Sequence, residues 1–349
     1  MFEHHTHHHR RIFRPLGLAA AATMALSLAG ISPAHATPGT SSAAVANGVL
    51  TVIGTNRADA VTIDFTSTDT VGVELDGEHQ SFRRGTFTSV SVFTGAGDDT
   101  VRTTSGGSAA SDLPLTILAG NGVDTVTGGA GADTIVGDDG DDRLLGGAGN
   151  DLLFGGRGAD FVNGQVGTDT EVLGTGDDTA GWLPGEGSDA VSGGPGVDTL
   201  AFTGSAGDEV MSLSASGHRA VFLRSPGSVR MDLDTVERLD VAPLGGADNV
   251  TIGDLTGTDL TEAVVDLSEN LAGDHRDDTV VVDGTAGNDQ IAIGADRGAV
   301  DVSGLQPHTR VTGAEPTDEL DIDAGAGDDR VDVTDEVRAL MDVHVDLGS

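Results

Sequence analysis

Nine aspartates recur at regular spacing in the middle of the chain, and acidic side chains in such an array can bind cations. They advance in steps of nine to Asp178, and a two-residue insertion precedes the last two: Asp124, Asp133, Asp142, Asp151, Asp160, Asp169, Asp178, Asp189 and Asp198. Two residues after each aspartate the position is usually aliphatic, as at Ile135 and Leu144. A fixed period of this kind predicts copies of one structural unit stacked on each other.

The residues between the aspartates supply the rest of a cation site. The template is G-G-x-G-x-D-x-U-x, where U is a large aliphatic residue. Glycines at the first, second and fourth positions allow positive φ and close backbone approach, so six residues can form a tight loop whose carbonyl oxygens turn toward a common point. Carbonyl and carboxylate oxygens are the ligands that calcium prefers. The candidate glycines are Gly129, Gly131, Gly147, Gly149, Gly156 and Gly158.

The last three residues of the template, x-U-x, form a minimal strand with one apolar side chain pointing inward. Two nonapeptides then close one flattened coil. A flexible acidic linker has a similar Gly and Asp content, but a linker has no reason to keep an aliphatic residue in phase with each aspartate. The pattern therefore favours an all-β solenoid.

On these residues the chain resembles the RTX (repeat-in-toxin, hemolysin-type) calcium-binding family, over roughly a quarter of its length. The resemblance implies a right-handed parallel β-roll that holds calcium between the loops of stacked repeats on both edges, about five to seven ions in all. The repeat at residues 164–172 is the weakest, because Gln165 replaces the second glycine and Glu171 replaces the aliphatic residue.

Less regular motifs flank the roll in three cassettes of two motifs each. The acids that end the paired motifs are 40, 39 and 40 residues apart: Asp59 and Asp99, Glu209 and Asp248, Asp289 and Asp329. Alternating segments between the motifs indicate further β-strands that cap the roll. Asp99 and Asp329 are secondary metal candidates. The expected domains are a signal peptide (1–36), an N-terminal cassette (37–118), the RTX roll (119–202) and a C-terminal β region with two cassettes (203–349).

The first 36 residues have the order of a secretory signal peptide. Basic residues up to Arg14 precede an apolar run from Leu16 to Ile31, and Ala34-His35-Ala36 provides a cleavage site. Arg10-Arg11 also resembles a twin-arginine signal, so the export route remains open between Sec and Tat. We expect a secreted, extracellular protein.

The net charge and the lack of cysteine limit the kinds of partner that the chain can bind. The formal charge is −38 and all 18 basic residues are arginines; removing residues 1–36 leaves 55 acids against 15 arginines, or −40. Such a chain repels nucleic acid and anionic membranes, so we expect calcium ions as partners, while a protein or glycan partner stays unknown. The chain has no cysteine, so metal ions must replace disulfides as staples.

Enzymatic motifs are missing from the sequence, including H-E-x-x-H, G-x-S-x-G and a cysteine nucleophile. We therefore expect a non-enzymatic calcium-binding protein. The first alternative is an extracellular polysaccharide hydrolase or lyase on a β-solenoid, which needs a cluster of Asp, Arg and His on one strand face; the sequence shows no such density. The second is a calcium-dependent matrix or adhesion protein.

Overall fold

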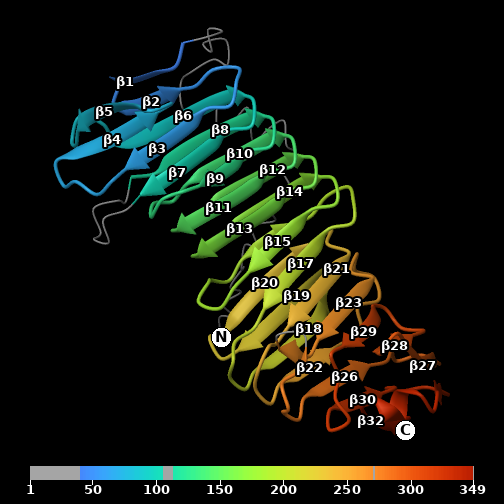
Figure 1. Cartoon of the computed structure of the whole chain (residues 1–349). Coiled ribbons are helices and arrows are strands. Elements are labelled where there is room, and N and C mark those ends of the chain that lie inside the picture. Colours follow the sequence, from blue (N-terminus) through green and yellow to red (C-terminus); the bar gives the residue numbers. More distant parts are fainter. Residues whose placement is uncertain (1–39, 105–112, 270–271, 349) are drawn as a thin grey trace, which may run out of the picture.

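The computed structural model describes residues 40–104, 113–269 and 272–348, and they fold almost entirely into β-strands stacked in a long array (Figure 1). The proposed signal peptide lies outside the described residues. No helix within the described ranges has the length and apolar character needed to cross a membrane.

Two sheets of 15 strands each run along the array. The first sheet has the spatial order β1 (Ser42–Ala46), β2 (Val49–Ile53), β6 (Ser89–Ala96), β8 (Leu115–Asn121), β10 (Thr134–Asp139), β12 (Leu152–Arg157), β14 (Thr170–Thr175), β16 (Ala190–Ser192), β20 (Val229–Asp234), β19 (Arg219–Ser225), β18 (Val210–Ser216), β22 (Asn249–Ile252), β26 (Thr279–Asp283), β30 (Glu319–Asp323) and β32 (Asp342–Asp346).

The second sheet has the order β31 (Arg330–Val333), β27 (Gln290–Asp296), β28 (Ala299–Ser303), β29 (His308–Thr312), β23 (Glu262–Asp266), β21 (Arg238–Ala242), β17 (Thr199–Thr203), β15 (Thr179–Trp182), β13 (Phe161–Val166), β11 (Arg143–Ala148), β9 (Thr125–Thr127), β7 (Thr100–Thr104), β3 (Ala60–Asp64), β4 (Thr70–Leu75) and β5 (Glu78–Arg83). The remaining elements are the ribbon of β24 (Ser268–Glu269) with β25 (Ala272–Gly273) and a 3₁₀ turn, η3 (Val337–Ala339).

The strand register confirms that two nonapeptides form one coil. In the first sheet Thr134 lies opposite Leu152, and in the second sheet Arg143 lies opposite Phe161, both in parallel pairs. Each step is 18 residues, twice the sequence period. Successive nonapeptides therefore alternate between the two sheets, which confirms the all-β roll.

The core of the roll is built from the aliphatic position of the template. Ile135, Leu144, Leu153 and Val162 are fully buried, and burying each such side chain stabilises the fold by about 1.5–3 kcal/mol. One inward side chain per short strand is enough because the facing sheet supplies the next. Glu171 is the exception: it occupies the same inward position and is 1% exposed.

The cassettes extend both sheets beyond the roll and add antiparallel hairpins. Strands β3, β4 and β5 pair antiparallel, as do β18, β19 and β20, and β27, β28 and β29. Near the start of the described residues, β1 pairs antiparallel with β2. The short alternation of Ala and Val there suffices for an edge strand.

Candidate metal centres

The acids that end the loops form ladders along the edges of the array. In each ladder the backbone N–H of one acid donates to a carboxylate oxygen of the next acid, at 2.7–3.1 Å. The first ladder joins Asp59, Asp99, Asp124, Asp142, Asp160, Asp178, Asp198 and Glu237. The second joins Asp133, Asp151, Asp169 and Asp189. The third joins Glu209, Asp248, Asp278 and Asp318, and the fourth joins Asp289 and Asp329.

Backbone carbonyl oxygens face the space between stacked loops. A Cβ added to Gly147 or Gly149 would come under 3.0 Å from the carbonyl oxygen of Gly129 or Gly131 in the loop before it. Gly147, Gly149, Gly156 and Gly158 all have positive φ, between 111° and 139°. Side chains are therefore excluded at these positions by both space and backbone conformation.

The expectation of positive φ was wrong at the first template position and at Gly129 and Gly131, which are not in the left-handed region. The first position is glycine for another reason. A Cβ on Gly146 would lie 2.5 Å from Oδ2 of Asp151 and 2.6 Å from the carbonyl oxygen of Gly164. The glycine therefore makes room for the carboxylate of its own loop.

Most acids of the ladders keep one oxygen without a partner. Their Oδ1 accepts the ladder hydrogen bond, while their Oδ2 is buried and unpartnered in Asp99, Asp124, Asp142, Asp151, Asp160, Asp169, Asp178, Asp198, Asp248 and Asp329. A buried carboxylate oxygen without a hydrogen bond is costly. Together with the nearby carbonyl oxygens it provides the hard donors that fit Ca²⁺. The residues of the loops therefore fit a calcium ion.

Burial raises the pKa of most of these carboxyls. Desolvation is the main cause and neighbouring acids add to it, so that the pKa rises to about 8 for Asp142 and to about 7 for Asp160. The pKa is about 7 for Asp151, Asp189 and Asp198, about 6 for Asp99, Asp133 and Asp248, and raised for Asp124, Asp169 and Asp178. A bound cation would favour the ionised form instead.

The residue at the second template position decides whether an acid is satisfied by its own loop. We call a loop closed where the N–H of this residue donates to the acid at the end of the loop. The closed loops are those of Asp59, Asp133, Glu209 and Asp289, with donors Thr55, Gly129, Ser205 and Thr285. None of these four donors has positive φ.

We call a loop open where the second residue has positive φ and the acid keeps an unpartnered oxygen. The second residues of the open loops are Gly95, Gly120, Asp138, Gly147, Gly156, Gln165, Gly174, Gly194, Leu244 and Gly325. Each closed loop begins a ladder, and the loops stacked after it are where the open ones occur. An open loop therefore always has another loop beneath it, and an ion could bind in the space between the two.

In three of the closed loops a hydroxyl of the second residue also donates to the acid, and in the loop of Glu209 the donor is Ser205 Oγ at 2.7 Å. Thr55 Oγ1 donates to Asp59 at 3.1 and 3.2 Å, and Thr285 Oγ1 donates to Asp289 at 2.9 and 3.1 Å. In the third ladder the buried guanidinium of Arg224 pairs with Glu209, with Nε donating at 2.9 Å. Groups of the chain itself thus satisfy Asp59 and Asp289, whereas all the donors to Glu209 bond its Oε1 and leave its Oε2 buried and unpartnered.

No three His, Asp or Glu side chains gather as a ready-made metal cluster in residues 40–104, 113–269 and 272–348. The carboxylates instead occur one per loop, at each step of a ladder.

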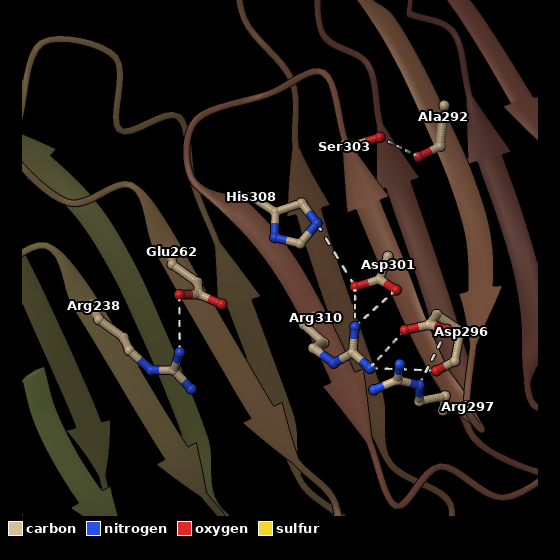
Figure 2. Close-up of polar contacts among 9 residues, drawn as sticks. All are labelled: Arg238, Glu262, Ala292, Asp296, Arg297, Asp301, Ser303, His308 and Arg310. Carbon is tan, nitrogen blue, oxygen red and sulfur yellow. Dashed lines mark hydrogen bonds and ion pairs between the residues drawn. The ribbon is translucent and has the colours of Figure 1, made fainter.

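One Asp, Arg and His constellation does lie on a strand face, contrary to the sequence expectation. Figure 2 shows Asp301 on β28 beside Arg310 and His308 on β29. Arg310 Nη1 donates to both oxygens of Asp301, at 2.8 and 3.0 Å, and His308 Nε2 is 3.7 Å from Oδ1. The antiparallel register sets Asp301 opposite Arg310, which spacing alone did not indicate. Both carboxylate oxygens of Asp301 are paired with Arg310. The three side chains therefore fit a structural role on the sheet surface better than a role in acid–base catalysis.

The sequence pattern gave no metal role to three acids with unpartnered oxygens, Glu171, Glu209 and Asp248. Asp248 was recognised as a cassette acid, but Leu244 at the second position hid an open loop; its φ is 78°. Glu171 was treated only as a defect, although its Oε2 is buried and unpartnered. An acid at an inward position of an all-β repeat is the signal that could have identified it.

The comparisons with known proteins agree with this geometry. The family model of the RTX calcium-binding nonapeptide repeat matches in four copies, at residues 118–153, 136–171, 145–180 and 185–201. No curated protein matches the chain. Proteins with this repeat bind Ca²⁺. The chain is thus an RTX repeat protein, with its calcium-binding nonapeptides in the central roll.

Proposed function

We propose that this protein is exported and that its roll folds when it meets extracellular calcium. The observation that carries the proposal is the row of buried, unpartnered carboxylate oxygens, one for each open loop of the ladders. Without a cation, these acids must either bind protons or remain ionised in a poorly solvated site. A divalent ion that bridges two loops removes this cost.

Coupling to folding follows from the way the sites are made. Each site needs two loops that are adjacent only after the coils have stacked, so the unfolded chain contains no site. Binding free energy then adds directly to folding free energy. Extracellular calcium modules work with dissociation constants of roughly 10⁻⁴–10⁻³ M, which suits a roll that stays unfolded in the cell and folds outside.

We further propose where the protein acts and what it binds. Residues 1–36 act as a cleaved signal peptide, and the mature chain binds calcium without catalysing a reaction. Its charge disfavours nucleic acid and anionic membranes. The acids of the roll and Asp99, Asp248 and Asp329 in the cassettes hold the ions, with carbonyl oxygens of the glycine loops. The three cassette acids have the same unpartnered oxygen as the open-loop acids of the roll.

Far-UV circular dichroism of residues 37–349 tests this function. The chain is measured in chelator and then titrated with calcium, with magnesium as the control ion. We expect a cooperative gain of β-sheet signal with calcium and little change with magnesium, which keeps its water shell and demands a stricter geometry. A full β-sheet signal in chelator that calcium leaves unchanged, in both amplitude and melting temperature, would contradict the proposal.

A further inference from the structure

The weakest repeat of the roll contains a buried acid that the template does not require. Glu171 takes the inward position between Leu153 and Val191 on the neighbouring strands, where every other coil of the roll supplies an apolar side chain. Only 1% of Glu171 is exposed. A carboxyl group in such a place needs a compensating partner.

One oxygen of Glu171 has a structural role. Its Oε1 accepts a hydrogen bond from Gly164 N at 2.6 Å. At the start of the same ladder the equivalent glycine, Gly128, donates to the carbonyl oxygen of Leu145 in the next coil at 2.8 Å. After Gly164 the next coil carries the two-residue insertion, and β13 pairs with β15 at only two positions. Glu171 therefore replaces a missing carbonyl acceptor.

The other oxygen has no such role. Oε2 of Glu171 is buried and has no hydrogen-bond partner. A neutral carboxyl would leave an O–H or a carbonyl unmatched, and an ionised one would leave a buried charge unmatched. Oδ2 of Asp169 is also unpartnered, and it lies under 3.0 Å from the place where a Cβ on Gly164 would be. Two unpartnered oxygens therefore lie beside the same glycine.

The insertion adds more negative charge to this space. Glu186 receives hydrogen bonds from Leu183 N at 2.6 Å and from Asn163 Nδ2 at 3.2 and 3.3 Å, which hold its carboxylate in place. Asp189, Asp169 and Glu186 all act electrostatically on Glu171. No other interval of the roll has an acid at the inward position as well as the loop acids.

We propose that the space between the loops of Asp169 and Asp189 is a cation site in which Glu171 is an additional ligand. The ion is a hard cation, Ca²⁺ or a lanthanide, held by the carboxylates of Glu171 and Asp169 with carbonyl oxygens of the loops. This site binds more tightly than the regular intervals because it has one more carboxylate. The inference rests on calcium binding by the roll but not on the coupling of binding to folding.

The only tryptophan of the chain provides a local probe. Trp182 Nε1 donates to the carbonyl oxygen of Gly187 at 2.8 Å, within the loop that ends at Asp189. The sequence has no tyrosine. Excitation of Trp182 should therefore sensitise Tb³⁺ luminescence from an ion in this interval far more than from ions elsewhere, since energy transfer falls steeply with distance.

The experiment titrates Tb³⁺ into the mature chain and into Glu171→Gln, which keeps an oxygen for Gly164 N but loses the charge. Glu171→Leu restores the aliphatic residue of the template and guards against a folding defect. Asp124→Asn, in the other ladder, is the matched control. In the parent chain we expect the sensitised signal to appear at low Tb³⁺, before the regular intervals fill. In both Glu171 variants the signal should need at least about tenfold more Tb³⁺. In Asp124→Asn it should be unchanged.

Equal Tb³⁺ affinity in the parent chain and in both Glu171 variants would overturn the inference, as would a parent chain without sensitised emission. Calcium-induced circular dichroism on the same samples separates this outcome from a failure of the proposed function. If calcium still changes the β-sheet signal, the roll binds calcium and only the Glu171 site is wrong. If neither ion has an effect, the proposed function fails with it.

Discussion

The open loops of the roll and the closed loops of the cassettes share one template but satisfy their acids in different ways. Asp160 in the roll uses one oxygen for the ladder and leaves the other unpartnered. Asp289 in a cassette has both oxygens bonded to Thr285. The same acidic position can thus be completed by the chain or left for an external cation.

The difference depends on the second residue of the loop. A threonine with ordinary φ turns its N–H and hydroxyl toward the acid, whereas a glycine with positive φ turns its N–H away and allows the loop beneath to approach. Arg224 shows a third solution, in which a guanidinium pairs with Glu209 at the start of a ladder. The chain therefore carries its own cation in a place where no loop lies beneath to help hold an ion.

The largest expected effect is that of pH on the stability of the open-loop roll in the absence of calcium. Burial raises the pKa of the roll acids above 3.8, to about 6 for Asp133 and about 8 for Asp142. An acid with a raised folded-state pKa contributes stability that is present below the unfolded value and is lost as pH rises through the folded value. In chelator the roll should therefore be folded to a greater extent at pH 5 than at pH 8, as followed by the β-sheet signal and its melting in circular dichroism. In excess calcium the trend should reverse, because protons compete with the ion.

A calcium-free roll that melts higher at pH 8 than at pH 5 would show that these acids are solvated rather than buried.

Removing the guanidinium of Arg224 should have the next largest effect on stability. Arg224→Met leaves Glu209 in an apolar site with an uncompensated charge, which costs about 3–5 kcal/mol. Urea unfolding should show the same loss in chelator and in calcium. The double variant Arg224→Met with Glu209→Gln is the control and should recover most of the stability. A loss that calcium repairs would mean that Glu209 can recruit an ion.

Neutralising the acid of one open loop should change the stability of the roll by an amount that depends on calcium. Asp160→Asn keeps the acceptor for Asp142 N–H but removes the charged ligand. In saturating calcium it should cost about 2.7 kcal/mol, the value for a site held at 100 times its dissociation constant. In chelator, where the roll is not folded, the variant should leave the circular dichroism spectrum unchanged. Urea unfolding in calcium and circular dichroism in chelator measure the two effects.

The matched control is Asp59→Asn in a closed loop, which removes an acceptor of Thr55 N–H and should be equally harmful with and without calcium. If Asp59→Asn and Asp160→Asn respond alike to calcium, the distinction between closed and open loops fails.

The smallest effect is expected for the hydroxyl of a closed loop. Thr285→Val keeps the backbone N–H but removes the hydroxyl that donates to Asp289 and accepts from Gly287 N–H, and each such hydrogen bond contributes about 1 kcal/mol. The cost should be the same in chelator and in calcium. Thr251→Val, on a strand between open loops, is a threonine-to-valine control outside the loop hydrogen bonds.

The period of the sequence was enough to predict the roll, because a nine-residue template fixes the strand length, the inward residue and the step of 18 between coils. It could not separate open from closed loops. Gly129 and Gly147 are the same residue at the same template position, yet only Gly147 has positive φ. The reason is non-local: Gly147 stacks on the loop of Gly129, whereas the loop of Gly129 begins its ladder.

The cassettes were predicted in composition but not in arrangement. The spacing of 39 or 40 residues between paired acids identified them, but the hairpins that fill this spacing depend on antiparallel register. That register brings Asp301 and Arg310 together from β28 and β29, and it brings Arg224 to Glu209 from β19. Contacts of this kind have no fixed period, so the sequence pattern cannot reveal them.

The most direct test of the account is amide hydrogen exchange of the mature chain, resolved by region, in chelator and in calcium. The account predicts that in chelator the strands of the roll, β8 to β17, exchange fast while the cassette hairpins β18 to β20 and β27 to β29 stay protected. Calcium should then protect the roll and change the hairpins little. Equal protection of roll and hairpins in chelator would contradict the claim that the roll depends on an external cation.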